Sequence, residues 1–448
     1  MRLLAVVFLP FPLFAQDSSA PPVDDPRIRA IVSAVSAQRL EADLRKLVSF
    51  ETRHTASDTI STTRGIGAAR RWIKAEFDRI STACGGCLEV SYVSEMWRGA
   101  RLAKPTNVVS VIAIQRGTTD PDRYLVMSGH FDTRNSDPLN ATDPAPGAND
   151  DGSGTVAVIE AARVLSKHKF NGTIVYATLA GEEQGLNGGE TLARMAKSQN
   201  WRLTGVLNND IVGNTRGQDG ISEDTTVRVF SEGTPPTETE AERLRRRFTG
   251  GEVDGISRQL ARYIDRTAAR YVPGIDVWLI YRLDRYGRGG DHRAFADEGF
   301  PAVRFSETHE HYDRQHQNVR VENGVPYGDV IEGVNFPYLA KVTAVNAASL
   351  AGLAWAPGAP RTVRITGGVR PAAQMTWQAP SDSAHVLGYR VYWRRTDSPT
   401  WDFSEWVGPA TSHTFTGRVI DNFFFGVASV GRDGHESVVV FPTTPQAN

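Results

Sequence analysis

Apolar residues recur along the chain in two spacings, one typical of helices and one typical of buried strands. The apolar positions 66, 69, 73, 77 and 80 step by three or four residues, which predicts a helix with one buried face. Similar patterns predict helices over residues 27–50, 155–167, 257–269 and 336–353. Short β-branched or apolar runs at residues 107–114, 124–127, 173–179, 205–212 and 302–305 predict strands covered on both faces. Because several of these strands alternate with helices, we predict an α/β layered domain.

The pattern changes after a short stretch rich in proline at residues 355–360, which we interpret as a linker. Beyond it, residues 361–443 contain short alternating runs at 362–365, 374–377, 388–393, 422–430 and 437–440, which predict a small all-β sandwich. Trp377, the run Gly-Tyr-Arg-Val-Tyr-Trp at 388–393 and the late strand resemble a fibronectin type III module. Such a module could contact a surface or polymer, or could cap the larger domain.

The first fifteen residues differ from the rest of the chain. A basic residue, Arg2, precedes an almost entirely apolar run at 3–14, and a polar run follows from Gln16. This pattern predicts a secretory signal over residues 1–15. The alternative, a buried strand, fits Pro10 and Pro12 poorly. We therefore expect export to the periplasm or the extracellular space, and no membrane span, because no other run approaches the ~20 apolar residues required.

The composition is that of a globular protein: of 448 residues, 40% are hydrophobic and 23% charged. Fifty Lys and Arg against fifty-one Asp and Glu leave a net charge of -1, and no basic stripe carries interleaved aromatics, so we expect no nucleic-acid partner. The two cysteines, Cys84 and Cys87, form a C-x-x-C pair. In an exported protein this spacing favours a structural disulfide over a zinc ribbon or a redox motif.

Four polar clusters stand at or just beyond the ends of predicted strands, where open α/β sheets bind ligands. They are Ser-Gly-His-Phe-Asp at 128–132, Asn-Asp-Asp-Gly at 149–152, Gly-Glu-Glu at 181–183 and Asn-Asn-Asp at 208–210. Each alone has an ordinary explanation as a cap or a solvated turn. Together they would concentrate negative charge that a pair of divalent cations compensates. Histidine and carboxylates without cysteine suit zinc, with manganese or cobalt as possible substitutes.

A last metal ligand should come from the C-terminal part of this domain. Three histidines stand close together there, His309, His311 and His316, and His292 follows Asp291 slightly earlier. Spacing alone does not choose among these four.

The order of these motifs, from His-x-Asp to the final His, closely resembles the co-catalytic zinc exopeptidases of metallopeptidase family 28 over about residues 35–350. That family includes secreted bacterial leucyl aminopeptidases, glutamate carboxypeptidases and glutaminyl cyclases. The resemblance implies a three-layer αβα zinc-exopeptidase fold over residues 27–354, with a mixed, mainly parallel central sheet. It also implies two zinc ions and peptide substrates with a free N-terminus.

The resemblance further implies a role for each site residue. One metal would take His130, Asp150 and Asp210, and the other Asp150, Glu183 and His316, since Arg-Gln-His-Gln-Asn at 314–318 matches the family's final-ligand loop. The remaining roles would be Asp132 orienting His130, Asp151 following Asp150 through a cis peptide, Glu182 as general base, and Tyr286 helping to hold the oxyanion. The distance from Tyr286 to Asp291 departs from the pattern of the bacterial aminopeptidases.

We therefore predict a metal-assisted aminopeptidase in which Glu182 takes a proton from water and returns it to the leaving amine. Two alternatives stay open from the sequence. One is a glutaminyl cyclase or carboxypeptidase on the same scaffold. The other is a non-catalytic binding protein in which the C-terminal module carries the function.

Overall fold

The computed structural model describes residues 20–442, so the predicted signal segment at residues 1–15 lies outside the described residues. Within residues 20–442 the search for a helix with the length and apolar character of a membrane span finds none. Cys84 and Cys87 are joined in a disulfide just after the third helix, which confirms the predicted structural pairing.

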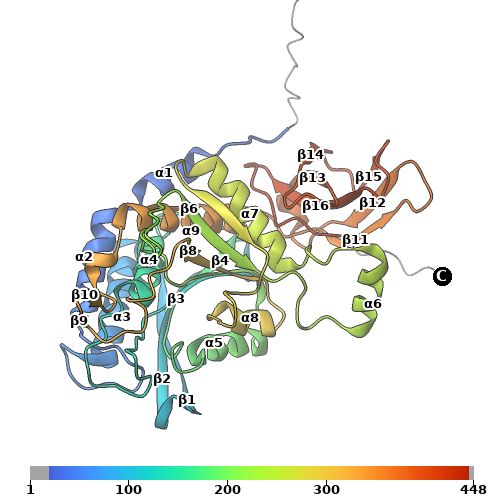
Figure 1. Ribbon diagram of the computed structural model, residues 1–448. Coiled ribbons are helices and arrows are strands. Elements are labelled where there is room, and N and C mark those ends of the chain that lie inside the picture. The colour runs from blue at the N-terminus through green and yellow to red at the C-terminus, as the bar shows by residue number, and fades with distance from the viewer. Residues whose placement is uncertain (1–19, 443–448) are drawn as a thin grey trace, which may run out of the picture.

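An eight-stranded sheet forms the centre of the larger part of the molecule (Figure 1). Its strands lie in the order β1-β2-β4-β3-β5-β8-β6-β7. The pairs β3/β4, β3/β5, β5/β8 and β6/β7 are parallel, and β1/β2, β2/β4 and β6/β8 are antiparallel. The strands are β1 (Glu89–Gly99), β2 (Leu102–Gln115), β3 (Asp120–His130), β4 (Gly172–Leu179), β5 (Arg202–Asn209), β6 (Thr226–Ser231), β7 (Asp276–Ile280) and β8 (Ala302–Glu307). The predicted mixed, mainly parallel sheet is confirmed.

Helices cover both faces of this sheet. Side chains alternate along β4, so Ile174 and Tyr176 join the core on one face while Val175 and Ala177 join the core on the other. The first core contains residues of α1 (Pro26–Ala34), α2 (Ala37–Val48), α3 (Gly65–Ala83), α4 (Gly154–Leu165), α7 (Ile256–Tyr271) and α9 (Phe336–Trp355), and the second contains residues of α5 (Asn187–Ser198) and α8 (His292–Asp297). Burial on both faces explains why the strand runs are continuously apolar.

The helical segment predicted over residues 27–50 is divided into two helices. The chain becomes extended at Val35, and the Ser36 side chain then caps α2 by accepting a hydrogen bond from the backbone N–H of Arg39 at 3.2 Å. The strand predicted over 205–212 ends earlier than expected, at Asn209, because the backbone turns at Ile211, which has a left-handed φ of 62°. Asp210 therefore follows the strand, as the residues of the other clusters do.

Several elements were not predicted from the apolar pattern, most of them because little of their surface is buried or because they are short. They include β1, β6, β7, α5, α8, the small hairpin of β9 (Arg320–Glu322) and β10 (Val325–Tyr327), and α6 (Glu240–Thr249). The helix α6 buries none of its residues and is begun by a capping box between Thr239 and Glu242.

Two small antiparallel sheets pack around a separate core at the C-terminus. One contains β11 (Arg361–Thr366), β12 (Ala373–Gln378) and β15 (Ser412–Phe415), and the other contains β14 (Phe403–Trp406), β13 (Val386–Arg395) and β16 (Phe423–Gly431). The predicted strand at 437–440 makes only an isolated bridge, between Val427 and Val440. The likeness to fibronectin type III and the domain boundaries stay predictions.

Buried polar contacts join these small sheets to the larger part. The Asp254 carboxylate, before α7, accepts from Arg262 of α7 and from Arg394 of β13, at 2.7 Å in each case. The indole N–H of Trp401 donates to the side chain of Gln259 at 3.2 Å. The two parts therefore share charged and polar groups that water does not reach.

Candidate metal centre

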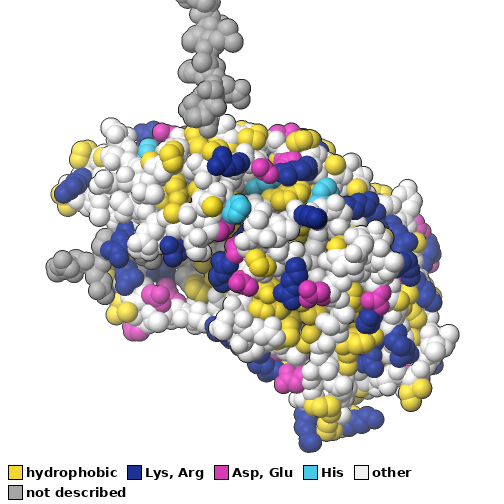
Figure 2. Space-filling view, turned by 180° about the vertical axis from the view of Figure 1, so that it is seen from behind, with side chains coloured by type: hydrophobic (Ala, Val, Ile, Leu, Met, Phe, Trp, Pro, Cys, Tyr) yellow, Lys and Arg dark blue, Asp and Glu magenta, His cyan; other side chains and the backbone are white. Residues whose placement is uncertain are grey.

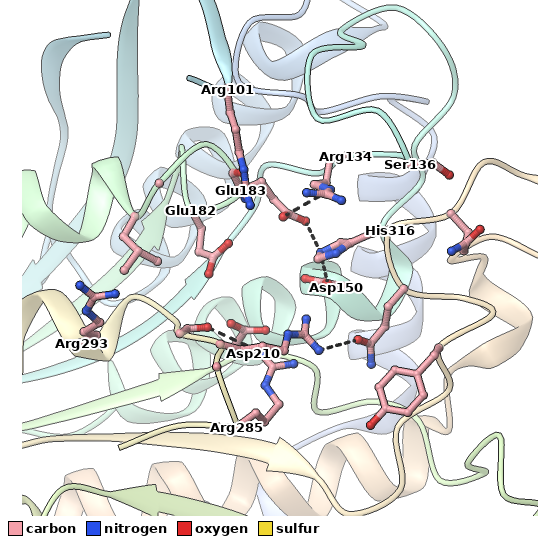
Figure 3. Close-up of a pocket in the computed structure, with 18 residues that line it drawn as sticks. Arg101, Arg134, Ser136, Asp150, Glu182, Glu183, Asp210, Arg285, Arg293 and His316 are labelled. Carbon is pink, nitrogen blue, oxygen red and sulfur yellow. Dashed lines mark hydrogen bonds and ion pairs between the residues drawn. The ribbon is translucent and has the colours of Figure 1, made fainter. Parts of the chain in front are cut away.

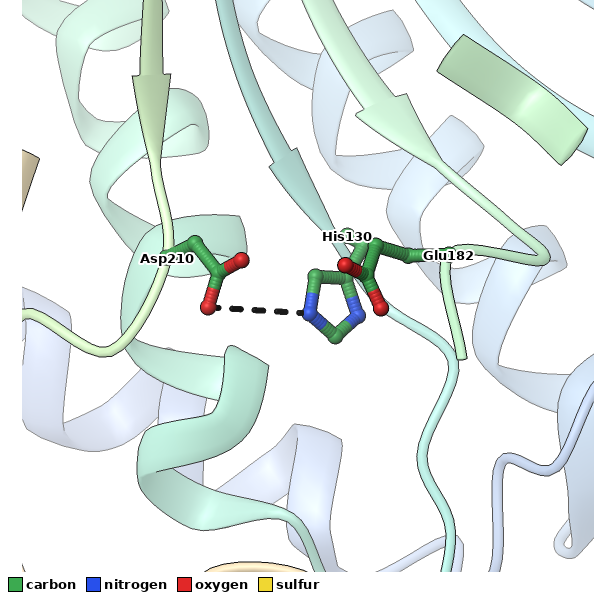
Figure 4. Close-up of side chains that lie close together, drawn as sticks. All are labelled: His130, Glu182 and Asp210. Carbon is green, nitrogen blue, oxygen red and sulfur yellow. Dashed lines mark ion pairs between the residues drawn. The ribbon is translucent and has the colours of Figure 1, made fainter. Parts of the chain in front are cut away.

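The candidate site lies where three adjacent parallel strands end. His130 is the last residue of β3, Glu182 and Glu183 follow β4, and Asp210 follows β5 (Figure 4). Because β3 pairs with both β4 and β5, the sheet brings these side chains to one edge. The structure thus places together the residues whose convergence the sequence predicted.

One group of possible ligands comprises Asp150, Glu183 and His316, whose ligand atoms lie within 4.8 Å of one another. The Nε2 atom of His316 is 3.0 Å from Asp150 Oδ2 and 3.0 Å from Glu183 Oε1 (Figure 3). Although burial opposes protonation, the carboxylates of Glu183 and Asp150 raise the pKa of His316 to about 10. His316 therefore lies between two carboxylates whose negative charge favours a positive group at this position.

A second group comprises His130, Glu182 and Asp210. The Nε2 atom of His130 is 4.0 Å from Asp210 Oδ1 and 3.3 Å from Asp150 Oδ1. The two oxygens of Asp150 therefore face different groups, Oδ1 toward His130 and Oδ2 toward His316. This is the position that a bridging carboxylate requires.

The residues present fit zinc. Within residues 20–442, the buried His130 Nε2 and Glu183 Oε1 atoms make no hydrogen bond of good geometry beyond the ion-pair contacts given above, and a bound cation would satisfy both atoms. Burial, with Asp210 and Glu183 nearby, raises the pKa of Glu182 well above its usual range, so this edge is short of positive charge. Nitrogen and carboxylate oxygen donors without cysteine are a donor set that zinc accepts.

Asp132 fixes the backbone of both glutamates. Its two carboxylate oxygens accept the N–H groups of Glu182 and Glu183, each at 3.2 Å, and one of them also accepts the hydroxyl of Thr55 at 3.1 Å. His130 Nδ1 lies 3.1 Å from the main-chain oxygen of Asp132 and 3.6 Å from its carboxylate. The contact that holds His130 at hydrogen-bond distance is thus with the main chain of Asp132, while its carboxylate anchors the turn that carries Glu182. The predicted role of this carboxylate in orienting His130 stays a prediction.

The turn that carries Asp150 is held from two sides. The peptide bond from Asp150 to Asp151 is cis, and the Asp151 carboxylate accepts the N–H groups of His130 and Gly154, both at 2.9 Å. Gly154 is needed here, because a Cβ atom would lie 2.2 Å from the carbonyl oxygen of Asn209. On the other side, Asp329 accepts the Asp150 N–H at 2.7 Å.

The structure distinguishes among the histidines that spacing left equal. His309 Nδ1 pairs with Asp219 at 2.8 Å, and His292 Nε2 lies 2.9 Å from the carbonyl oxygen of Leu283. His311 is not part of either ligand group among the residues that the structure describes. Only His316 of these four reaches the candidate ligands, and it does so from a left-handed backbone with φ of 54°.

Tyr286 is not brought to the centre. Its side chain is 89% exposed, its ring lies 5.5 Å from the Arg282 guanidinium, and it is absent from the described residues that line the adjacent cavity. The exposed position gives no contact that would hold an oxyanion, so the arrangement differs from the one that the family resemblance implied for this residue.

Two positioning residues escaped the sequence analysis. The fully buried Arg304 of β8 places Nη2 2.8 Å from Asp210 Oδ1 and Nη1 3.0 Å from Asp284 Oδ2. Asp329 holds the turn of Asp150, as described above. An arginine inside the apolar strand run at 302–305 was a usable signal, because a buried charge needs a partner. Asp329 stands in a loop without a motif.

A cavity of about 880 Å³ opens beside both ligand groups. Histidine, acidic and basic side chains lie close together near the middle of the face that Figure 2 shows. The cavity is lined by Arg101, Arg134, Ser136, Asp150, Glu182, Glu183, Gly185, Leu186, Asp210, Arg285, Gly287, Arg288, Gly289, Arg293, Tyr312, Gln315, His316 and Gln317. Its position gives a substrate access to the candidate metal ligands.

Comparisons with known proteins support the fold and identify the family. A probable zinc metalloprotease of Leptosphaeria maculans is 43% identical over 425 residues, which cover 94% of this chain and 98% of that protein. An aminopeptidase, LapA of Legionella pneumophila, has the same fold at a TM-score of 0.55 and 19% identity, over 78% of each chain. An aminopeptidase from Aneurinibacillus sp. strain AM-1 matches at 0.50 and 14%, over 74% of this chain and 97% of that one. Residues 110–323 match the model of peptidase family M28, and with the extended identity to the first relative this shows that the chain belongs to that family of zinc-dependent hydrolases.

Proposed function

We propose that the protein is an aminopeptidase that uses two zinc ions to hydrolyse the N-terminal peptide bond of its substrates, with Glu182 as general base. The observation that supports this proposal most is Asp150, whose two oxygens face His130 and His316 on opposite sides. His130, Asp150 and Asp210 would hold one ion. Asp150, Glu183 and His316 would hold the other.

Zinc bound in this way would supply Lewis-acid chemistry, polarising the scissile carbonyl and making water easier to deprotonate. Glu182 would accept a proton from the attacking water and deliver it to the leaving nitrogen as the carbon–nitrogen bond breaks. The products are a free amino acid and a peptide shortened by one residue. Asp132 would hold Glu182 in place through the backbone N–H at 3.2 Å.

Glu182 has a second possible role, because it lies within ligand distance of His130 and Asp210. We assign it as the base because Asp150 Oδ1, at 3.3 Å from His130 Nε2, already supplies a carboxylate to that ion. The two roles differ in what the loss of its charge would do to the metal content.

Glu182→Gln should reduce turnover of aminoacyl-arylamides by a factor on the order of 10² or more, the usual contribution of general acid/base catalysis, while both zinc ions are retained. Glu183→Gln is the matched control, because it changes the neighbouring carboxylate and should lose zinc. Activity and zinc per chain are measured on the same samples. Full activity in Glu182→Gln, or loss of zinc from it, would remove the base from this mechanism.

We also infer that the mature protein is exported to the periplasm or the extracellular space. The Cys84–Cys87 disulfide supports this, since such bonds persist mainly in oxidising compartments. N-terminal sequencing of protein recovered outside the cytoplasm should begin near Gln16. Recovery of a full-length, reduced chain from the cytoplasm alone would contradict export.

A further inference from the structure

Five arginines line the cavity beside the metal centre: Arg101, Arg134, Arg285, Arg288 and Arg293. The acidic residues among the lining residues are the four carboxylates of the centre itself, at positions 150, 182, 183 and 210. Two divalent cations would carry four positive charges and so offset these four negative ones. The lining side chains would then leave a surplus of positive charge over the space that a substrate enters.

On one wall, two arginines point into the cavity, and the carboxylate that one of them contacts belongs to the candidate ligand Glu183 (Figure 3). Arg101, in the turn between β1 and β2, is exposed and donates to the main-chain oxygen of Glu183 at 2.9 Å; no ion pair of Arg101 occurs among residues 20–442. Arg134, after β3, has its Nε 4.0 Å from Glu183 Oε2. Since Glu183 is a candidate metal ligand, its charge would be directed to the cation rather than to Arg134.

On the opposite wall, arginines outnumber the carboxylates that they contact. Arg285 and Arg288 both contact Glu310, at 3.2 and 3.3 Å, and Arg228 contacts the same carboxylate at 2.6 Å. Although burial opposes ionisation of Glu310, Arg285 and Arg228 lower its pKa to about 2. Arg285 also contacts Asp284 at 3.2 Å, and Nη1 of Arg288 also donates to the side-chain oxygen of Gln315 at 3.2 Å. The Glu310 carboxylate still serves three guanidinium groups, and among the described residues Nε and Nη2 of Arg288, a third of whose side chain is exposed, are left for a further anion.

We propose that this cleft selects substrates that carry a carboxylate close to the scissile bond. The inference rests on the proposed function of the same site, and it names the substrate class. Guanidinium groups bind carboxylates through short, charge-assisted and often paired hydrogen bonds. A cleft lined by charges of one sign also raises the local concentration of ligands of the opposite sign. The carboxylate can belong to an N-terminal Asp or Glu side chain or to the C-terminus of a short peptide.

A panel of substrates on the wild-type protein tests the proposal first. Glu- and Asp-arylamides should exceed Leu-arylamide in kcat/KM by about 10-fold or more, and Lys-arylamide should be the poorest, if the side chain supplies the carboxylate. A dipeptide acid should exceed the corresponding dipeptide amide by a similar factor if the C-terminus supplies it. Equal kcat/KM values in both comparisons, or a preference for Lys-arylamide, would contradict the proposed selectivity but not the proposed aminopeptidase activity. Failure to cleave any member would instead overturn the proposed function.

Variants test the arginines themselves. Arg101→Gln should raise KM for the preferred acidic substrate several-fold more than KM for the Leu substrate, with two zinc ions still counted. Arg71→Gln is the matched control, because Arg71 is also exposed and donates to main-chain oxygens but lies outside the cavity lining. Arg288→Gln provides a second test on the other wall. The proposal fails if neither cavity variant alters the ratio of acidic to neutral substrate.

Salt dependence provides a readout independent of variants. Raising ionic strength shortens the Debye length from ~10 Å at 0.1 M to ~3 Å at 1 M. The kcat/KM for acidic substrates should fall over this range while that for Leu-arylamide changes little. Parallel curves for the two substrates would contradict electrostatic selection by the cleft.

Discussion

Replacement of Arg304 by methionine removes a guanidinium that bridges a candidate zinc ligand and a buried carboxylate behind it. The side chain is fully buried, and it contacts Asp210 at 2.8 Å, Asp284 at 3.0 Å and the carbonyl oxygen of Gly289 at 2.9 Å. Although burial opposes ionisation, Arg304 holds the pKa of Asp284 well below its usual range. In the variant, two buried carboxylates would lose their shared cation.

The expected loss of stability follows from these contacts. Removing one partner of a buried ion pair costs about 3–5 kcal/mol, because the remaining charge is left uncompensated. An unfolding entropy of roughly 2.1 cal/mol/K per residue gives about 0.9 kcal/mol/K for a chain of this length. The melting temperature should therefore fall by about 3–5 °C in metal-free protein. The fall should be smaller with zinc, since a cation beside Asp210 compensates one of the two charges.

Zinc affinity should fall as well. Arg304 orients Asp210, and outer-shell partners of metal ligands typically contribute 10–100-fold in metal affinity. Competition with a zinc indicator measures the affinity, and thermal unfolding with and without a chelator measures the stability. Arg394→Met is the matched control, because Arg394 is equally buried and lies 2.7 Å from Asp254, far along the chain from any candidate ligand. It should lose stability and keep its zinc affinity.

The reasoning is refuted if Arg304→Met unfolds and binds zinc as the wild-type protein does. It is also refuted if Arg394→Met loses zinc affinity to the same degree, because the effect would then report general destabilisation. A fall in stability that zinc does not reduce would contradict the assignment of Asp210 as a ligand.

Two further predictions concern buried carboxylates. Burial outweighs the attraction of Arg39 and raises the pKa of Asp43 to about 6 in the folded chain, above the ~3.9 of an unfolded chain. The free energy of unfolding should therefore fall as pH rises from ~4 to ~6, because the folded chain binds the proton more tightly. Asp43→Asn should therefore be the more stable protein above this window, by up to ~3 kcal/mol, and urea midpoints that differ equally at all pH values would contradict this. In Asp329→Ala, the N–H groups of Asn149 and Asp150 lose their acceptor, so zinc content should fall several-fold with little change in melting temperature. Unchanged zinc binding in a titration would show that Asp329 does not support the candidate centre.

The sequence was sufficient for the features that follow from local pattern. The stripe of α3 lies in the core because residues three and four apart share one face of a helix. The candidate metal ligands at the ends of β3, β4 and β5 converge because parallel strands end at one edge. His316 could be chosen only through the resemblance to a family, since three histidines share its loop.

Long-range packing decided what the sequence could not show. β1 has most of its residues exposed, so no strong apolar pattern marks it. The partners of Arg304 lie 94 and 20 residues away, and no local spacing connects them. The exposed position of Tyr286 depends on the path of the loop after β7, which contains three arginines and three glycines and carries no periodicity.

The carboxylate that α7 and β13 share through Arg262 and Arg394 bears on how the C-terminal sheets can work. The two parts cannot separate without exposing these buried charged groups to water. We therefore expect the C-terminal sheets to stay fixed against the larger part. A surface bound by the C-terminal sheets would then keep a constant orientation relative to the cavity beside the candidate metal ligands. A chain cut at Pro360 would consequently lose a buried arginine from this network, and with it part of the peptidase unit's own stability.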